Sequence, residues 1–137
     1  VISGSPQGIE KAQLLAKEKG VKLAVVLEVS GAFHSSLMQE ASLKLAGELE
    51  KITITSPKIP VISNVTAKPV LGIDEIKQNL IRQVSASVLW EDSIKFILSQ
   101  GVSNFIEFGP GKVLKGLMRR IDSNAQVKNI EKKADII

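Results

Sequence analysis

Short apolar runs, rich in β-branched residues, alternate with amphipathic stretches along the 137-residue sequence. The run from Val21 to Val29 is typical of a β-strand, and so is the run from Ser103 to Phe108. In the stretches between such runs, apolar residues recur every three or four positions, as they do on one face of a helix. This alternation predicts an α/β or α+β domain.

Local signals place the individual elements. Ser5 is a candidate N-cap of the first helix, and Gly20 follows the lysine-rich turn that ends this helix. Further helices are predicted around residues 37–49, 76–84, 90–98 and 112–121. Strands are predicted at 1–2, 21–29, 61–65 and 103–108, with 51–55 as a short candidate and 67–72 as a turn. The polar tail after Asp122 is expected to fray.

The composition narrows the functions that such a domain can have. The absence of cysteine excludes thiol catalysis, thiolate metal sites and disulfides. Lys and Arg total 18 against 14 Asp and Glu, a net charge of +4, but the basic residues are scattered and aromatic residues make up only 4%. These features argue against nucleic-acid binding and leave an acidic partner or anionic ligand open. We also expect a soluble domain, because no apolar stretch approaches the roughly 18 to 20 residues of a membrane span.

His34 is the only histidine and the natural candidate for proton transfer, since histidine is the side chain best suited to exchange protons near neutral pH. It follows a glycine-containing loop between an apolar strand and an apolar helix, where scaffolds often present reactive groups. The alternative is a helix-entry residue that hydrogen-bonds the backbone. None of the nearby serines lies in a Gly-x-Ser-x-Gly nucleophile elbow. A single histidine gives no support for a metal site.

The turn Gly109-Pro110-Gly111-Lys112 precedes a predicted helix and is a candidate phosphate cradle, because backbone N–H groups at a helix N-terminus attract anions. An ordinary strand-to-helix turn is the alternative, since no Walker or dinucleotide motif is complete. Lys112, Lys115 and Arg119 recur at helical spacing. They form either a basic face for an acidic partner or a merely solvated face.

Several segments together carry a family resemblance over almost the whole sequence. They are Val1-Ile2-Ser3-Gly4, Ser30-Gly31-Ala32-Phe33-His34-Ser35, Pro60 to Asn64 followed by Val65-Thr66-Ala67-Lys68-Pro69, Arg82-Gln83, and Phe108 to Leu114. In combination they resemble the C-terminal half of malonyl-CoA:acyl carrier protein transacylases, which load malonyl groups in fatty-acid biosynthesis. Residues after about Ile121 carry little of this resemblance.

The resemblance implies an α/β fold that comprises part of an α/β-hydrolase-like acyltransferase core and the remaining strand-helix-strand of a small ferredoxin-like subdomain. Residues 1–29 would be the C-terminal part of the ferredoxin-like subdomain. Residues 30–121 would be the C-terminal part of the acyltransferase core, and residues 122–137 a tail.

The resemblance also implies a ping-pong transfer of malonyl from coenzyme A, through an acyl-serine, to the phosphopantetheine thiol of acyl carrier protein. His34 would be the general base and acid, oriented by the backbone carbonyl of Gln83. Phe33 would select malonyl, because its ring leaves little room for an α-methyl branch. No cofactor is implied, since malonyl-CoA is a substrate, and a cytoplasmic location is expected.

The family's serine elbow, oxyanion glutamine and malonate-binding arginine have no counterpart in these 137 residues. We therefore expect the N-terminal half of the same enzyme to be a partner of this chain. Without that half, this chain is expected to be inactive. Two other functions stay open. One is a non-catalytic fragment that binds acyl carrier protein through Lys112, Lys115 and Arg119, and the other is an acyltransferase domain of a polyketide synthase.

Overall fold

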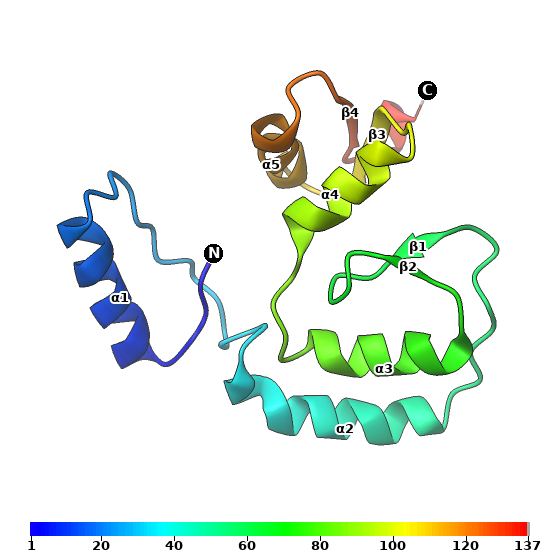
Figure 1. Cartoon of the computed structure of the whole chain (residues 1–137), viewed down its shortest axis with the longest axis horizontal. Helices are drawn as coiled ribbons and strands as arrows, with labels where there is room; N and C mark the ends of the chain where they lie inside the picture. Colours follow the sequence, from blue (N-terminus) through cyan, green and yellow to red (C-terminus); the bar gives the residue numbers. More distant parts are fainter. Residues whose placement is uncertain (137) are drawn as a thin grey trace. The chain divides into compact units, whose positions relative to one another are not determined.

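The structure, a computed structural model, describes residues 1–136. Helices and strands are interspersed along the chain (Figure 1), which confirms the predicted α/β class. Internal contacts divide the chain into two compact units, one made of Val1–Val65 and Pro69–Val88 and the other of Thr66–Lys68 and Leu89–Ile137. Within the described residues, no helix combines the length and the apolar character that crossing a membrane requires.

The first helix, α1 (Pro6–Glu18), begins and ends where the sequence predicted. The Oγ of Ser5 accepts a hydrogen bond from the backbone N–H of Gly8 at 3.1 Å, which satisfies a donor that the helix itself leaves free. Gly20 follows the helix with a φ of 80°, a left-handed conformation that glycine adopts without strain. Local sequence signals were therefore sufficient for this element.

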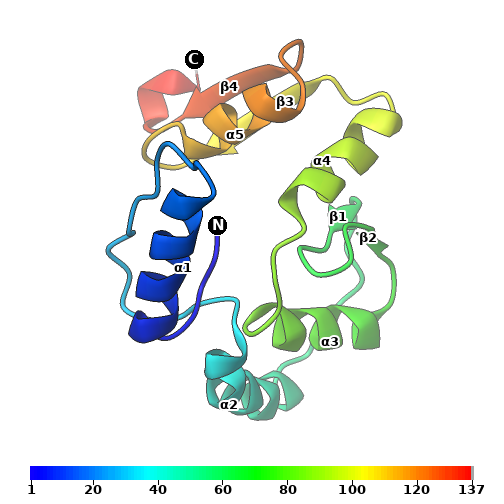
Figure 2. The ribbon, with the colours of Figure 1, turned by 60° about the vertical axis from the view of Figure 1, so that its left-hand side comes forward.

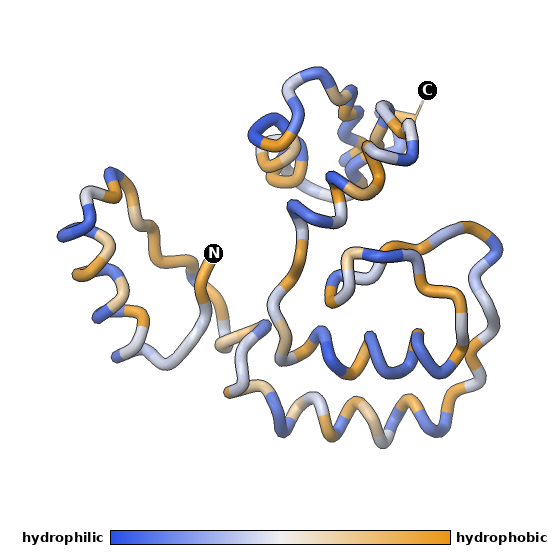
Figure 3. Tube along the Cα trace, viewed as in Figure 1, coloured by the Kyte–Doolittle hydropathy of each residue, from blue (hydrophilic) through white to orange (hydrophobic). Residues whose placement is uncertain are grey.

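The predicted strands on either side of α1 are wrong, because residues 1–2 and 21–29 form no β-strand. Val21, Leu23 and Val25 are 50%, 78% and 67% exposed. Figure 3 shows that most of the segment after α1 is hydrophobic. A strand requires a neighbour that accepts hydrogen bonds from its N–H groups and donates to its C=O groups. No strand among the described residues pairs with this segment. Residues 51–55 form no strand for the same reason.

Two neighbouring helices form the centre of the first unit. A short 3-10 helix, η1 (Ser36–Met38), leads into α2 (Gln39–Glu50), and α3 spans Ile73–Gln83. α2 and α3 lie side by side in both views (Figures 1 and 2). Leu49 of α2 is buried, and so are two polar residues, Ser42 of α2 and Asn79 of α3. Polar side chains in such positions need hydrogen-bond partners.

A short antiparallel ladder belongs to the same unit. It joins β1 (Val61–Ile62) to β2 (Pro69–Val70), with Val61 opposite Val70. The predicted strand at 61–65 is thus shorter than expected, and the predicted turn at 67–72 contains a strand. Pro69 tolerates its place because this ladder has only two strands, so that its missing N–H faces no further partner.

The second unit contains a parallel pair of strands and three helices. These elements are α4 (Trp90–Ser99), β3 (Asn104–Phe108), α5 (Val113–Ile121), β4 (Gln126–Ile130) and the 3-10 helix η2 (Lys133–Asp135). The strands pair in register from Asn104 and Gln126 to Phe108 and Ile130. Figure 2 shows the two strands side by side.

The expected frayed tail is therefore wrong, because β4 is a paired strand within it. Its sequence, Gln-Val-Lys-Asn-Ile, contains three polar residues, because side chains of a strand alternate between two faces. Two of these residues, Gln126 and Lys128, are exposed. Pairing with β3 supplies the ladder hydrogen bonds that the local sequence does not reveal. Ile137, the last residue of the predicted tail, lies outside the described residues.

Candidate functional site

His34 lies at the carboxyl end of α3. Its Nδ1 is 2.7 Å from the backbone carbonyl oxygen of Gln83, and its backbone N–H donates to the carbonyl of Val84 at 3.2 Å. The last carbonyl groups of a helix have no partner within the helix, so they are available to both donors. The structure thus brings together two residues that are 49 positions apart in the sequence.

This contact determines which ring nitrogen carries the hydrogen. A carbonyl oxygen only accepts, so Nδ1 of the neutral His34 ring is protonated and Nε2 has the free lone pair. His34 is exposed in its unit. A ring held at one nitrogen and free at the other is suited to take a proton from a nucleophile and return it to a leaving group.

The backbone at His34 is held in an uncommon conformation. Its φ of 60° lies in the left-handed region, which residues other than glycine rarely adopt. The Oγ of the next residue, Ser35, donates to the carbonyl of Ala32 at 2.7 Å, so that a hydrogen bond spans His34 from one side to the other. Strain of this kind costs about 1–3 kcal/mol and is common at functional sites, where surrounding contacts maintain it.

Phe33 precedes His34 and is 46% exposed. Its ring lies against Gly31, where a Cβ atom would stand 3.9 Å from the ring carbons. A Cβ atom at that distance would make an ordinary van der Waals contact with the ring.

Ser42 is a structural contributor that the sequence analysis missed. It is 2% exposed, and its Oγ donates to the carbonyl of Ile81 at 2.8 Å. Because α2 follows the His34 loop, this bond connects the helix after His34 to the last turn of the helix that holds Gln83. A polar residue on an otherwise apolar helix face, between Ala41 and Leu45, was the available signal.

A hollow of about 360 Å³ adjoins Gln83 in the same unit. Its walls are mainly apolar side chains of β1, β2 and α3, with the amides of Asn64, Asn79 and Gln83 among them. Asn79 is 7% exposed, and its Nδ2 has no hydrogen-bond partner within residues 1–136. The hollow is therefore an apolar surface with a few amides next to the partner of His34.

The turn at residues 109–112 does not offer the predicted phosphate cradle. The buried carboxylate of Glu107 accepts hydrogen bonds from the N–H groups of Leu114 at 2.9 Å and Lys115 at 3.1 Å, in the first turn of α5. These are the donors that an anion at this helix end would use. The side chain of Asn129 also donates to the carbonyl of Gly111 at 2.8 Å and steadies the turn. The alternative of an ordinary strand-to-helix turn is therefore the better description.

The predicted basic residues belong to the second unit. Lys112 and Arg119 are exposed and Lys115 is partly exposed. No salt bridge involves any of the three within the described part of the chain. Their charges are therefore available to an acidic surface.

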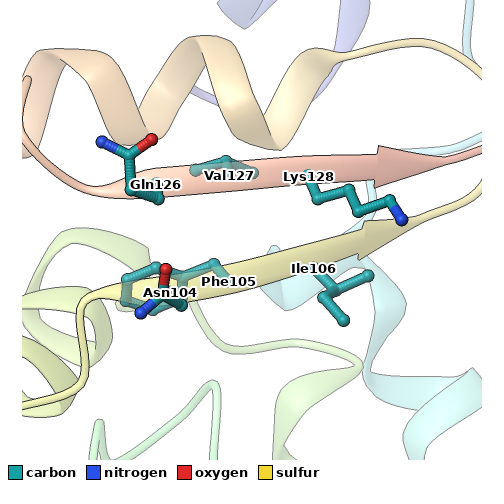
Figure 4. Close-up of a pocket in the computed structure, with 6 residues that line it drawn as sticks. All are labelled: Asn104, Phe105, Ile106, Gln126, Val127 and Lys128. Atoms are coloured by element: carbon teal, nitrogen blue, oxygen red, sulfur yellow. The ribbon is translucent and has the colours of Figure 1, made fainter.

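The second unit also contains a shallow pocket of about 280 Å³ on the paired strands. Figure 4 shows its lining, which consists of Asn104, Phe105 and Ile106 from β3 and Gln126, Val127 and Lys128 from β4. These six lining residues include one charged side chain, Lys128, and no Asp, Glu, His or Ser that could act with it in catalysis. Across residues 1–136, no cluster of three or more His, Asp or Glu side chains is arranged to hold a metal ion.

No protein-family model matches the sequence. Individual proteins do. The chain is 47% identical over 130 residues to the malonyl CoA-acyl carrier protein transacylase of Bacillus subtilis, a match that covers 95% of this chain and 40% of that protein. It is also 43% identical over 127 residues to the polyketide biosynthesis malonyl CoA-acyl carrier protein transacylase PksC of the same organism, covering 92% of this chain and 44% of the relative.

Solved structures of such enzymes have the same fold over this region. The malonyl-CoA:acyl carrier protein transacylase of Xanthomonas oryzae superposes with a TM-score of 0.92 at 35% identity, covering 97% of this chain and 42% of that one. A malonyl-transacylase in complex with a type II polyketide synthase acyl-carrier protein gives a TM-score of 0.93 at 36% identity, with 97% and 43% coverage. The chain is homologous to malonyl CoA-acyl carrier protein transacylases. It matches the C-terminal portion of these transacylases and spans less than half of their length.

We predict that Glu107→Ala destabilises the second unit, because it leaves the N–H groups of Leu114 and Lys115 without their acceptor. The expected loss in the free energy of unfolding is about 1–3 kcal/mol. Urea denaturation measures it. Glu48→Ala, which removes an exposed carboxylate paired with Lys51, is the control and should change stability by less than about 0.5 kcal/mol. Equal effects of the two substitutions would show that Glu107 does not cap α5.

Proposed function

We propose that this chain is the C-terminal part of a malonyl-CoA:acyl carrier protein transacylase of fatty-acid biosynthesis. The observation that carries the proposal is the 2.7 Å contact between Nδ1 of His34 and the carbonyl oxygen of Gln83. It leaves Nε2 as a base in the chain that is homologous to these transferases. The malonyl donor would be malonyl-CoA, and the acceptor the phosphopantetheine thiol of acyl carrier protein.

In the proposed reaction, Nε2 of His34 takes the proton of a serine hydroxyl as the serine oxygen attacks the malonyl thioester. The carbon–sulfur bond breaks, and the imidazolium returns the proton to the coenzyme A thiolate. His34 then takes the proton of the carrier thiol as its sulfur attacks the malonyl-serine ester. The carbon–oxygen bond breaks, and the serine regains the proton. The serine would belong to the part of the enzyme that this chain does not span.

The finer fold assignment is part of the proposal. Residues 1–29 would complete a ferredoxin-like subdomain, and residues 30–121 an α/β-hydrolase-like core. The exposed apolar segment 21–29 supports this, since its strand-like sequence has no partner among the described residues. The N-terminal half of the same enzyme would supply the missing strands. The proposed enzyme uses no cofactor and acts in the cytoplasm.

A second candidate function is malonyl loading in polyketide biosynthesis. The 43% identity to the polyketide transacylase PksC favours it. The chemistry at His34 would be the same, and only the carrier protein would differ. Comparing kcat/KM for a fatty-acid carrier and a polyketide carrier decides between the two functions.

The test of the catalytic role is His34→Ala in the full protein. Removing a positioned general base should lower the rate of malonyl transfer by roughly 10²-fold or more. The neighbouring Ser36→Ala, an exposed position, is the control and should leave the rate unchanged. A His34→Ala rate within a few-fold of the parent would disprove the assignment of His34.

Phe33 is proposed as the residue that selects malonyl over methylmalonyl. Phe33→Ala should raise the ratio of kcat/KM for methylmalonyl-CoA to that for malonyl-CoA by about 10-fold or more, because a smaller side chain makes room for one methyl group. Phe33→Tyr keeps the ring and should leave the ratio unchanged. The selector role is wrong if both variants behave like the parent.

Lys112, Lys115 and Arg119 are proposed to bind the acidic carrier protein. Replacing all three with glutamate should weaken carrier binding and flatten its dependence on salt. The matched control makes the same charge change at three exposed lysines, namely Lys11 and Lys17 of α1 and Lys19 directly after it. Titration of the carrier at several salt concentrations measures both. If the α5 variant retains the affinity and salt dependence of the control, the carrier docks elsewhere.

A further inference from the structure

Gln83 presents two polar groups, and the proposed mechanism uses only one of them. Its backbone carbonyl accepts the hydrogen bond from His34. Its side-chain Oε1 lies 3.3 Å from Nδ2 of Asn64, which donates to it. The two amides belong to different elements, since Asn64 follows β1 and Gln83 is the last residue of α3. This bond therefore connects the end of a strand to the end of the helix that orients the histidine.

Asn64 is presented from a backbone that is itself held in place. The residue before it, Ser63, is 7% exposed, and its Oγ accepts a hydrogen bond from the N–H of Val65 at 3.2 Å. On the other side, Ile62 is paired with Pro69 in the β1–β2 ladder. The side chain of Asn64 thus reaches Gln83 from a defined position instead of from a loose loop.

The hydrogen bond from Asn64 lies at the carboxyl end of α3, where a helix is least stable. The last turn of a helix frays, because its carbonyl groups have no partners further along the helix. Ser42 anchors this turn at Ile81, two residues before Gln83. Backbone bonds also hold this turn, since Ala86 donates to the carbonyl of Arg82 and His34 to that of Val84. The bond from Asn64 adds a restraint on the side chain of Gln83.

We propose that Asn64 is a positioning residue, which holds Gln83 so that its carbonyl keeps the His34 ring in the Nδ1-protonated, reactive form. This inference rests on the proposed role of His34 as general base. Asn64 does not touch the reacting atoms. Its effect passes through the side chain of Gln83, so substituting either amide should have the same consequence.

The test uses Asn64→Leu, Gln83→Met and the double variant in the full protein. Both substitutions remove the side-chain contact, and Gln83→Met keeps the carbonyl that His34 uses. Nitrogen-15 NMR of the His34 ring, assigned with a His34→Gln variant, measures the Nδ1-protonated fraction of the neutral ring. Steady-state kinetics with malonyl-CoA and carrier protein measure kcat and KM.

Each single variant should lower the Nδ1-protonated fraction of the ring. Each should also lower kcat by about 3- to 10-fold, the effect of losing one ordinary hydrogen bond, with KM nearly unchanged. The double variant should equal the single ones, because all three lack the same contact. If Asn64→Leu does not fold, Gln83→Met still provides the comparison with the parent.

The matched control is Gln78→Met, which changes an exposed glutamine of α3 in the same way. It should alter neither the ring spectrum nor kcat. An unchanged tautomer in Asn64→Leu or Gln83→Met, or strictly additive effects in the double variant, would overturn the proposal. If the parent transfers no malonyl but the tautomer still shifts in both single variants, the positioning role stands and the proposed function fails.

Discussion

Backbone groups at the end of a helix have no partner inside the helix, and the arrangement of polar side chains in this chain depends on that requirement. At the carboxyl end of α3, the carbonyls of Ile81 and Gln83 accept hydrogen bonds from Ser42 and His34. At the amino end of α5, two free N–H groups are taken by Glu107. The same requirement thus orients the one histidine and removes the predicted anion site.

The chain buries little apolar surface for its length, and this bears on how the site would work. Ile106 and Phe108 of β3 are 56% and 72% exposed, although parallel strands in proteins are normally covered on both faces. The solved transacylases superpose closely on the chain, and it spans only 42% or 43% of their length. The exposed apolar faces therefore agree with the proposal that the remaining part of the enzyme, with its serine, packs against this part.

The helices were predicted more completely than the strands, for a physical reason. Of the predicted strands, 103–108 is confirmed by β3 and 61–65 is shortened to β1, whereas 1–2, 21–29 and 51–55 form no strand. A helix closes its hydrogen bonds within about one turn, so that the cap at Ser5 and the stop at Gly20 define α1 from local sequence alone. A strand closes its hydrogen bonds with another segment. Residues 21–29 have a strand-like sequence and pair with no strand among residues 1–136, whereas residues 126–130 have a polar sequence and pair with β3. In both cases the presence or absence of a pairing strand decides the outcome, and the local sequence pattern carries no information about it.

The sequence by itself determined that the chain has one histidine, no thiol chemistry and a combination of motifs that resembles malonyl transacylases. It also predicted the positions of α1 to α5, although α3 begins three residues before its predicted start at Ile76. Only the tertiary structure decided that Nδ1 of His34 meets the carbonyl of Gln83, that Asn64 and Ser42 hold the same helix end, and that Glu107 occupies the start of α5. Most of these partners lie tens of residues apart, and their hydrogen bonds form only when the elements that carry them have packed together.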